Sequence, residues 1–204
     1  MGRLLVVATP IGNLDDLSPR ALEALSSAAV VYCEDTRRTG NLFARHGLTS
    51  PRVSCHGHNE HRRVGEALER LVAAAAAAGH PVEAIPGPSA VLAILSISGF
   101  PTVPFTFLGF PPSRRGERDR WYAANAGRAG TAVLFESPFR VVESLEALAR
   151  AWGDPPVVLG RELTKLHEEV LRGRASETAR LLAARPGVKG EIVLAAAASP
   201  PEPA

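Results

Sequence analysis

Short apolar segments of strand character alternate with helical segments along this chain, and that alternation constrains the fold most strongly. In the first half the β-branched and aliphatic runs predict strands at Leu4–Val7, Val30–Cys33, Val53–Cys55 and Val82–Ile85. The intervening segments predict helices that begin after Ser18-Pro19, near Thr39, at Glu60 and after Ser89, with stops at Gly47 and Gly79. Because short links join strand to helix to strand, we predict a mostly parallel sheet covered on both faces.

The second half repeats this alternation after a Gly/Pro-rich segment at 99–104, which we interpret as a hinge between domains. Strands are expected at Phe105–Phe110, Thr131–Phe135, Val157–Gly160 and Glu191–Ala195, and helices at Glu117–Ala126, Arg140–Trp152 and Glu177–Ala184. The expected organisation is an N-terminal α/β domain at 1–103, a C-terminal α/β domain at 104–198 and a disordered tail at 199–204.

Composition excludes several classes of protein. Of the 204 residues, 46% are hydrophobic, which is too high for a disordered chain, and no long uncharged apolar run predicts a membrane span. Two cysteines cannot form a disulfide framework, so we expect a reducing, cytoplasmic compartment and no membrane partner. The net charge of +2 by itself neither indicates nor excludes a nucleic-acid partner.

Polar or Gly/Pro clusters follow five of the apolar runs. In open α/β sheets, ligands bind beyond the carboxyl ends of the strands, so we expect the clusters to converge on one ligand-binding edge. Taken one at a time, each cluster is equally explained as an ordinary turn. The five clusters are Thr9–Asn13, Glu34–Arg37, His56–Glu60, Pro86–Ser89 and Glu136–Ser137.

Several standard motifs are missing from the sequence. No Gly-x-Gly-x-x-Gly follows the first strand and no Gly-Lys-Ser/Thr occurs, which disfavours dinucleotides and nucleoside triphosphates. No Gly-x-Ser-x-Gly elbow occurs, which disfavours a hydrolase triad. The Cys55–His61 segment is rich in metal-ligand side chains, but its spacing matches no zinc motif, so we expect substrate contacts and no metal.

The charged residues offer two kinds of candidate. Glu34, Asp35 and Glu136 are candidate acid/base or amine-binding carboxylates, with helix N-capping as the alternative. The arginines at 114, 115, 118 and 120, with Trp121 and Tyr122 behind them, form the strongest basic patch. Guanidinium groups suit phosphates and the two rings suit stacking, while a solubilising helix start is the alternative.

Seven motifs in fixed order resemble the small-subunit ribosomal RNA methyltransferase I family of the tetrapyrrole methylase superfamily. They span the chain apart from its tail, which makes chance agreement improbable. The motifs are Ala-Thr-Pro-Ile-Gly-Asn-Leu (8–14), Glu-Asp-Thr-Arg (34–37), His-x-His-Asn-Glu (56–60), Pro-Gly-Pro-Ser-Ala (86–90), Phe-Glu-Ser (135–137), Arg-Glu-Leu-Thr-Lys (161–165) and Lys-Gly-Glu-Ile-Val-Leu (189–194).

The resemblance implies two α/β domains, the N-terminal one with a mostly parallel sheet and the C-terminal one with a mixed sheet, and S-adenosylmethionine in a cleft between them. It implies a homodimer that methylates a cytidine 2′-hydroxyl of 16S rRNA within the 30S subunit. The cofactor-binding residues it implies are Pro10, Ser89, Ala90, Phe135, Glu136, Gly160 and Gly190.

The matched motifs and the basic patch also give candidates for the RNA and for catalysis. The RNA-binding candidates are Arg37, Arg38, His56, His58, Asn59, Arg114, Arg115 and Arg118. Activation of the ribose hydroxyl needs a nearby base or cation. The candidates for that role, which the sequence does not rank, are Glu34, Asp35, Glu60, Arg161 and Lys165.

One departure from the family pattern lies near 70–72. The family has a further strand and a Ser-Asp-Ala-Gly-Thr-Pro type loop here, so roughly two dozen residues are missing. We hypothesise that this loop is disordered and was left out, with the remaining residues renumbered, which predicts a Cα–Cα separation near Arg70–Val72 well above about 3.8 Å. A genuine deletion would instead remove a part of the cofactor pocket. Two alternatives remain: a small-substrate or tetrapyrrole methylase of the same fold, and a non-catalytic binding module that has lost its cofactor loop.

Overall fold

The computed structural model describes residues 2–54 and 61–197, and the side chains of 61–66 are not described. The chain divides into two compact units, Met1–Pro88 (unit 1) and Ser89–Ala204 (unit 2). This division falls before the segment at 99–104 that the sequence indicated as a hinge. The reason is that the helix at Ala90–Ser98 packs on strands of unit 2. The tail at 199–204 lies outside the described residues.

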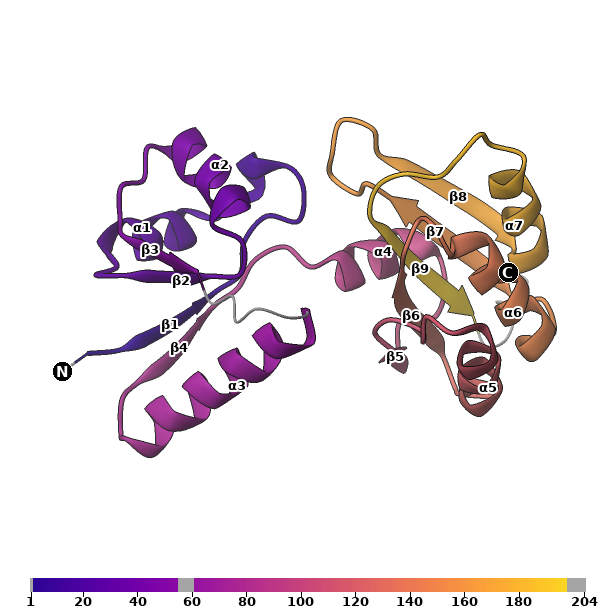
Figure 1. Cartoon of the computed structure of the whole chain (residues 1–204), viewed down its shortest axis with the longest axis horizontal. Coiled ribbons are helices and arrows are strands. Elements are labelled where there is room, and N and C mark those ends of the chain that lie inside the picture. Colours follow the sequence, from indigo (N-terminus) through magenta and orange to yellow (C-terminus); the bar gives the residue numbers. More distant parts are fainter. Residues whose placement is uncertain (1, 55–60, 198–204) are drawn as a thin grey trace. The chain divides into compact units, whose positions relative to one another are not determined.

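Unit 1 contains two small parallel sheets, drawn in indigo to magenta in Figure 1. Strand β1 pairs with β4, with Leu4 opposite Val82, and β2 pairs with β3, with Val31 opposite Arg52. The parallel pairing agrees with the sequence, but the four strands form two separate sheets. The elements are β1 Leu4–Val7, the 3-10 helix η1 Leu14–Asp16, α1 Pro19–Ser27, β2 Val31–Cys33, α2 Thr36–His46, β3 Arg52–Ser54, α3 His61–Ala77 and β4 Val82–Ile85.

Local capping residues fix the ends of the unit 1 helices. The Ala21 N–H donates to Ser18 Oγ at 3.2 Å, and Pro19 occupies the first turn of α1, as the sequence predicted. Gly47 ends α2 in the left-handed conformation, with φ of 65°. α2 begins at Thr36, three residues earlier than expected, because Asp35 caps it.

Helix α3 runs without interruption through 70–72. This continuity contradicts the expected long Cα–Cα separation at Arg70–Val72, so the chain is joined where the extra segment of the family pattern would lie. A helix holds successive residues at a rise of about 1.5 Å, which leaves no room for an additional loop. Any shortfall relative to other family members therefore lies within α3 itself and not in a loop beside it.

Unit 2 is built on one five-stranded sheet in the order β5-β6-β9-β7-β8. β5 and β6 are parallel and the other pairs are antiparallel, so the sheet is mixed, as the resemblance implied. The elements are α4 Ala90–Ser98, β5 Phe105–Phe107, α5 Arg115–Asn125, β6 Thr131–Glu136, α6 Val141–Trp152, β7 Pro156–Arg161, β8 Glu169–Arg174, α7 Ala175–Ala183 and β9 Ile192–Ala197.

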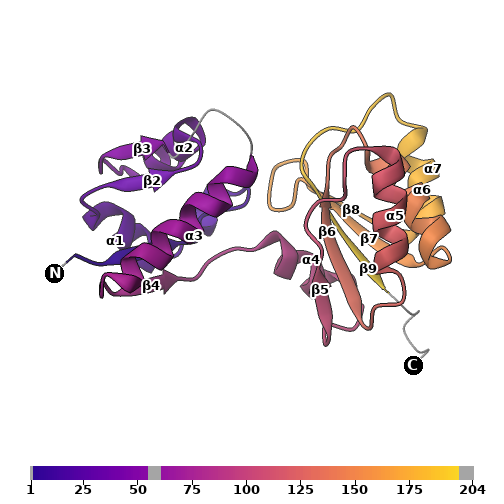
Figure 2. The ribbon, with the colours of Figure 1, turned by 60° about the horizontal axis from the view of Figure 1, so that its bottom comes forward.

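Helices cover both faces of this sheet. α4 lies on one face and α5, α6 and α7 lie on the other, as Figure 2 shows. Ile94 and Leu95 of α4 pack against Val133, Val158 and Val193. The opposite core contains buried side chains of α5, α6, α7 and the sheet, among them Tyr122, Leu134, Leu145, Leu148, Leu159 and Leu194. These two cores give unit 2 a rigid sheet whose ends position the loops.

The sequence did not indicate strand β8. Its segment, Glu-Val-Leu-Arg-Gly-Arg, carries charges that a buried strand would exclude, but β8 lies at the edge of the sheet. Charged side chains are typical of edge strands because they discourage further pairing. Within residues 2–54 and 61–197, no helix has the length and apolarity that a membrane crossing needs.

Candidate functional site

The strand register of unit 2 brings several predicted site residues to one end of the sheet. β5, β6 and β7 all finish at this end, because Glu136 and Arg161 both lie opposite Ile192, the first residue of β9. β8 starts at the same end, with Glu169 opposite Arg161. We call this end the carboxyl edge; its loops are 108–110, 137–140, 162–168 and 189–191. Ligands in α/β proteins bind at edges of this kind.

Helix α4 points its N-terminus toward the carboxyl edge. Ile94 lies against Gly160, near the end of β7, whereas the Arg172 guanidinium donates to the carbonyl of Ser98 at 3.1 Å from a position nearer the start of β7. The helix therefore runs opposite to β7. Ser89 caps it, accepting from the Leu92 N–H at 3.5 Å. The first-turn N–H groups of a helix lack helical partners and suit an anionic group.

Lys165 joins two loops of the carboxyl edge. Its Nζ lies 2.8 Å from Glu162 Oε1 and 3.1 Å from Glu191 Oε2. Burial lowers the pKa of Lys165, but the hydrogen bonds to Glu162 and Glu191 outweigh it and raise that pKa overall. The hydrogen bond from Lys165 also lowers the pKa of Glu162. Lys165 is therefore a cation at neutral pH, held in place by two carboxylates.

The loop that carries Lys165 has a strained backbone. Glu162 and Thr164 adopt positive φ values of 54° and 67°, which side chains with a Cβ rarely adopt. Gly190 has a φ of 98°, and a Cβ there would approach Glu162 Cγ within 2.5 Å. The Glu191 N–H donates to Glu162 Oε1 at 2.7 Å. Strained residues cluster at functional sites, so this loop is the best-defined candidate site in unit 2.

Arg161 forms part of a structural ion-pair network. Its Nε donates to Glu169 Oε2 at 2.9 Å, and Arg185 binds the same carboxylate with two hydrogen bonds. Arg161 also donates to the carbonyls of His167 and Lys189. The hydrogen bond from Arg185, followed by that from Arg161, lowers the pKa of Glu169 to about 2. Arg161 thus holds the loops around Lys165, and its hydrogen-bonding capacity is largely used.

Glu136 is buried at the end of β6. Its carboxylate accepts hydrogen bonds from the Ser137 N–H at 2.7 Å and from Ser144 Oγ at 2.5 Å, and Arg140 lies 3.1 Å away. Ser144 also contacts the Tyr122 hydroxyl, whose pKa is raised mainly by burial. Glu136 does not cap α6, because the N-cap residue is Arg140. The carboxylate instead fixes the 137–140 turn.

Unit 1 contains the described candidates around the start of α2. Asp35 accepts from the N–H groups of Arg37 at 2.8 Å and Arg38 at 3.4 Å, so it caps α2, which was the alternative considered from the sequence. Its pKa is lowered, first by the Arg37 backbone hydrogen bond. Glu34 is exposed, and the Arg37 side chain is 93% exposed.

The turns after β1 and β4 lie side by side in unit 1. The Ala8 N–H donates to the Ile85 carbonyl at 3.0 Å, and a Cβ on Gly87 would lie 3.1 Å from the Ala8 side chain. The clusters Thr9–Asn13, containing Pro10, and Pro86–Ser89 therefore follow neighbouring strands, as expected. Because β1-β4, β2-β3 and the unit 2 sheet are separate, the five clusters do not share a single sheet edge. Glu60, His56, His58 and Asn59 lie outside the described residues.

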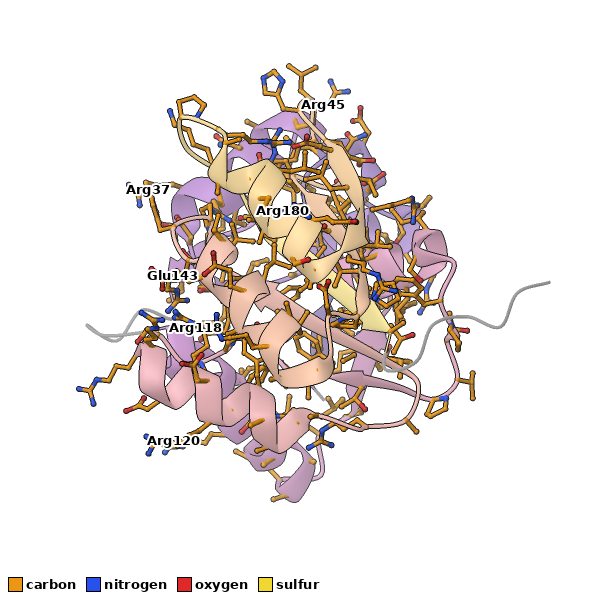
Figure 3. All side chains as sticks on the ribbon, turned by 90° about the vertical axis from the view of Figure 1, so that its right-hand side faces the viewer. Arg37, Arg45, Arg118, Arg120, Glu143 and Arg180 are labelled. Atoms are coloured by element: carbon orange, nitrogen blue, oxygen red, sulfur yellow. The ribbon has the colours of Figure 1, made fainter. Side chains whose placement is uncertain are left out.

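The basic patch divides into a buried and an exposed part. Arg118 is only 1% exposed; its guanidinium donates to Glu143 and to the Ser113 carbonyl, and its Nε is buried without a partner. Figure 3 shows Arg118 turned toward Glu143 and Arg120 extending outward. Arg118 is thus a core residue of unit 2, and its groups are not available to phosphate. The burial follows from the packing of α5 on α6.

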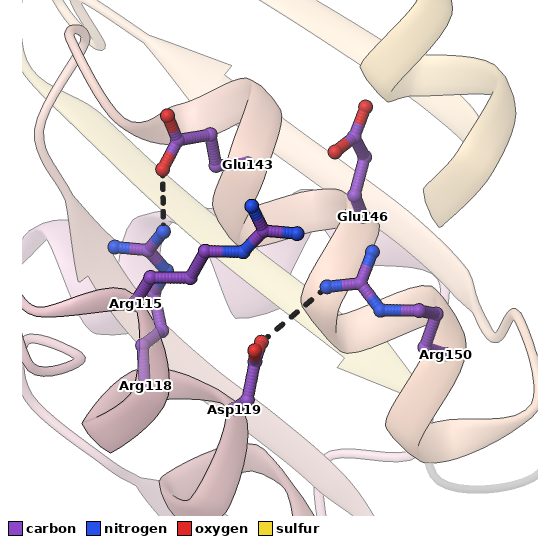
Figure 4. Close-up of a pocket in the computed structure, with 6 residues that line it drawn as sticks. All are labelled: Arg115, Arg118, Asp119, Glu143, Glu146 and Arg150. Carbon is purple, nitrogen blue, oxygen red and sulfur yellow. Dashed lines mark hydrogen bonds and ion pairs between the residues drawn. The ribbon is translucent and has the colours of Figure 1, made fainter.

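A small charged pocket lies beside Arg118, between α5 and α6. Figure 4 shows Arg115 pointing along this pocket between Glu143 and Glu146, and Arg150 bonded to Asp119 at 3.3 Å. Three arginines and three carboxylates balance in charge here. Tyr122 is fully buried, so its ring is not available for stacking, and the partly buried Trp121 packs against the same core. The exposed cations of the patch are Arg114, Arg115 and Arg120.

The sequence did not indicate Glu162, Glu191 or Arg140 as site residues. Glu162 and Glu191 stand inside two of the quoted motifs, so their presence was visible, but their joint contact with Lys165 depends on the β7–β9 register. Among the described residues, no group of three or more His, Cys, Asp or Glu side chains is arranged to hold a metal ion. At the carboxyl edge, Glu162 and Glu191 form ion pairs with Lys165.

These features define an α/β protein of two units whose best candidate site lies beyond the carboxyl ends of its strands. A family model of tetrapyrrole (corrin/porphyrin) methylases matches residues 3–72 and 63–179. The chain belongs to the tetrapyrrole methylase family.

Curated relatives agree with this assignment. The chain is 37% identical to a ribosomal RNA small subunit methyltransferase I from Micromonospora olivasterospora, covering 98% of this chain and 71% of the relative. It is 36% identical to a protein of the same name from Thermotoga maritima, covering 87% and 90%. The first alignment spans 223 positions although 98% of 204 residues is about 200. About 23 positions therefore lack a counterpart here, and the two family matches overlap within α3.

Solved structures show the same fold at low identity. Diphthine synthase matches with a TM-score of 0.65 and 15% identity, covering 95% of this chain and 90% of that one. The cobalt precorrin-4 methyltransferase CbiF matches with a TM-score of 0.57 and 20% identity, covering 94% and 93%.

Proposed function

We propose that this protein transfers a methyl group from S-adenosylmethionine to the 2′-hydroxyl of a cytidine in 16S rRNA, with the 30S subunit as its substrate. The observation that carries this proposal is the set of relatives named ribosomal RNA small subunit methyltransferase I, which match most of the chain at 36–37% identity. The family model supports the methyltransferase class.

The residues at the carboxyl edge fit such a cofactor. The first turn of α4, at Ser89 and Ala90, offers N–H groups suited to a carboxylate, and the Phe135 ring offers an apolar surface suited to adenine. When bound, the cofactor supplies an electrophilic methyl group. Gly160 and Gly190 let the chain pass close to Leu163 and Glu162, and Glu136 fixes the following turn. We include Pro10 of unit 1 on its motif alone.

Lys165 is the residue that we assign to the ribose oxygen. Methyl transfer needs the acceptor oxygen aligned with the methyl group, and a nearby cation stabilises that oxygen as its proton leaves. Lys165 is held as a cation by Glu162 and Glu191, so it would act electrostatically and not as a base. Glu34 and Glu60 stay candidates for the base. Asp35 and Arg161 act through the α2 cap and the Glu169 network.

A methylation assay with labelled cofactor tests the function. We expect the protein to label 30S subunits more than free 16S rRNA, with the label on a cytidine ribose. Lys165→Ala should lower turnover at least about tenfold, because one preorganised charge is lost. Asp35→Asn, which keeps the cap, should retain most of the activity. No labelling of either substrate would refute the proposed function, and wild-type turnover in both Lys165→Ala and Asp35→Ala would refute the site.

We further propose that the protein is a cytoplasmic homodimer. We also propose that His56, His58, Asn59 and the exposed arginines bind the RNA. The position of the family's substrate in the cytoplasm supports the compartment. Sedimentation of the full chain at micromolar concentration tests the dimer: a monomer mass would contradict it.

One observation favours a second function, a binding module without catalysis. About 23 aligned positions of a relative have no counterpart in this chain. If they contribute to the cofactor site, the chain would bind RNA without S-adenosylmethionine. Titration calorimetry with S-adenosylmethionine separates the two functions, because only the methyltransferase should release or absorb heat on binding.

A further inference from the structure

Three phenylalanine rings form a cluster on the sheet of unit 2, in which Phe107 and Phe110 are exposed and Phe135 is partly buried. The centroids of Phe107 and Phe135 lie 5.0 Å apart, and those of Phe110 and Phe135 lie 5.4 Å apart. Phe107 is 46% exposed and Phe110 is 62% exposed. We call Phe107, Phe110 and Phe135 the phenylalanine cluster. Contiguous exposed aromatic surface is uncommon on a protein without a partner for it.

The cluster is exposed because α4 does not extend over β5. Phe107 lies opposite Val133, and Val133 and Phe135 both belong to the core beneath α4, so the rings are on the α4 face of the sheet. α4 packs on β6, β7 and β9. β5 is the edge strand next to β6 (Figure 2), so its aromatic side chains lie on the part of this sheet face beside the strands that α4 covers.

The exposed arginines follow the cluster directly in the chain. Arg114 is four residues after Phe110, which limits their Cα–Cα separation to about 14 Å. The side chain of Arg114 is 83% exposed, and its ion pair with Glu117 is a surface contact of 3.3 Å. Such pairs contribute little and are easily exchanged for a phosphate. Arg115 is exposed as well, but its side chain points along the α5–α6 pocket between Glu143 and Glu146.

We propose that the exposed rings of the phenylalanine cluster, Phe107 and Phe110, together with Arg114, form a stacking surface for unpaired RNA bases. This inference rests on the proposed function, because it identifies how the same protein would hold RNA next to its target. Rings that accept any base and cations that bind the backbone are the combination that single-stranded nucleic acids require. Trp121 and Tyr122, the rings that the sequence placed beside these arginines, pack in or against the core instead.

The charges favour RNA over a second copy of the chain. The centre of a protein–protein interface is depleted in charged side chains, whereas exposed arginines follow this cluster within a few residues. The surface combines two exposed apolar rings with the exposed cation of Arg114. An RNA strand suits this combination of rings and cations, because the faces of its bases are apolar and its phosphates are anionic.

Equilibrium binding of a fluorescein-labelled single-stranded oligocytidylate, about ten nucleotides long to cover one such site, tests the proposal. The protein is the full chain without cofactor. Phe110→Ala should weaken binding about tenfold with an unchanged dependence of affinity on salt, because stacking releases no counterions. Arg114→Ala should reduce the slope of log affinity against log salt by about 1. Phe110→Trp should retain or increase affinity.

Leu181→Ala is the matched control, because Leu181 is also an exposed apolar residue, at 56%, on α7 of unit 2. It should bind RNA as the wild type does. Unchanged RNA affinity in Phe110→Ala would overturn the proposal, and so would a change from dimer to monomer in that variant. A loss of S-adenosylmethionine affinity with normal RNA affinity would also overturn it. Wild-type protein that binds RNA but does not methylate subunits would refute the proposed function alone.

Discussion

Glu169 holds the guanidinium groups of Arg161 and Arg185 on one partly buried carboxylate. The pKa of Glu169 falls from 4.5 to about 2 in the folded state, so the folded protein favours the ionised form. A depressed pKa adds stability above the unfolded value, and this stability is lost as the pH falls from about 4.5 toward 2. A pKa shift of one unit corresponds to about 1.4 kcal/mol. Because solvent screens the partly exposed ion pairs, we expect Glu169 to contribute only about 2 kcal/mol to the free energy of unfolding.

We therefore expect Glu169→Gln to be less stable than the wild type at pH 7 by about 2 kcal/mol. The difference should shrink progressively below pH 4.5, because the Glu169 carboxylate of the unfolded wild type then takes up a proton while that of the folded protein is still ionised. Urea unfolding at several pH values measures both quantities. A stability difference that is the same at pH 7 and pH 3 would show that the ion pairs contribute nothing.

Arg118 is a structural arginine, in contrast to the exposed arginines of the basic patch. Its guanidinium is buried and its Nε has no partner, so Arg118→Met keeps the packing of the stem and removes an unsatisfied donor. The lost bond to Glu143 should still cost about 2 kcal/mol of unfolding free energy. RNA affinity should be unchanged once folding is confirmed by circular dichroism. A reduced salt slope in Arg118→Met would instead mean that this arginine reaches phosphate.

Among the elements, the loops 162–168 and 189–191 depend on one another through Gly190. A Cβ at position 190 would lie 2.5 Å from Glu162 Cγ and would occupy a φ of 98°. Gly190→Ala should therefore displace Glu162, release Lys165 and cost about 2 kcal/mol or more. Turnover of the methylation reaction should fall with it. Gly187→Ala is the control, because nothing lies within 4 Å of a Cβ at that position, and an equal loss of stability and turnover in both variants would contradict the argument.

The elements that the sequence predicted best are those whose ends are determined locally. β1, β4 and α4 have the expected bounds, because Ser89 and the Gly/Pro residues around them define those ends within a few positions. β8 was missed because its edge position, which permits Arg172 and Arg174, depends on the whole sheet. Burial of Arg118 was missed for the same reason: its partner Glu143 is 25 residues away on another helix.

The candidate site follows the same rule. The motif that contains Lys165 was visible in the sequence, but its two carboxylate partners lie 3 and 26 residues away and meet only through the sheet register. Asp35 was recognised as either a functional carboxylate or a cap, and the N–H groups of Arg37 and Arg38 show that it caps α2. Short-range chemistry was therefore predictable, and long-range pairing was not.

At the scale of the whole molecule, the two units differ in how their strands are supported. Each of the four strands of unit 1 has a single hydrogen-bonded neighbour, and β3 and most of β4 are exposed. Two-stranded sheets are marginally stable unless other elements cover them. In unit 2, β6, β7 and β9 each have two neighbours and are almost entirely buried between two helical layers. In the alignment with the Micromonospora olivasterospora relative, about 23 positions have no counterpart in this chain.

This difference predicts unequal local stability along one chain. Amide hydrogens of β6, β7 and β9 should exchange with solvent more slowly than those of β1, β2, β3 and β4, because opening of a singly paired, exposed strand breaks fewer contacts. Native-state hydrogen exchange read by mass spectrometry measures this in the full chain, with the α4 amides as an internal reference on the unit 2 sheet. Addition of S-adenosylmethionine should slow exchange at 89–92 and 189–191 if the carboxyl edge binds it. Equal protection in the strands of both units would show that the molecule opens as one cooperative body.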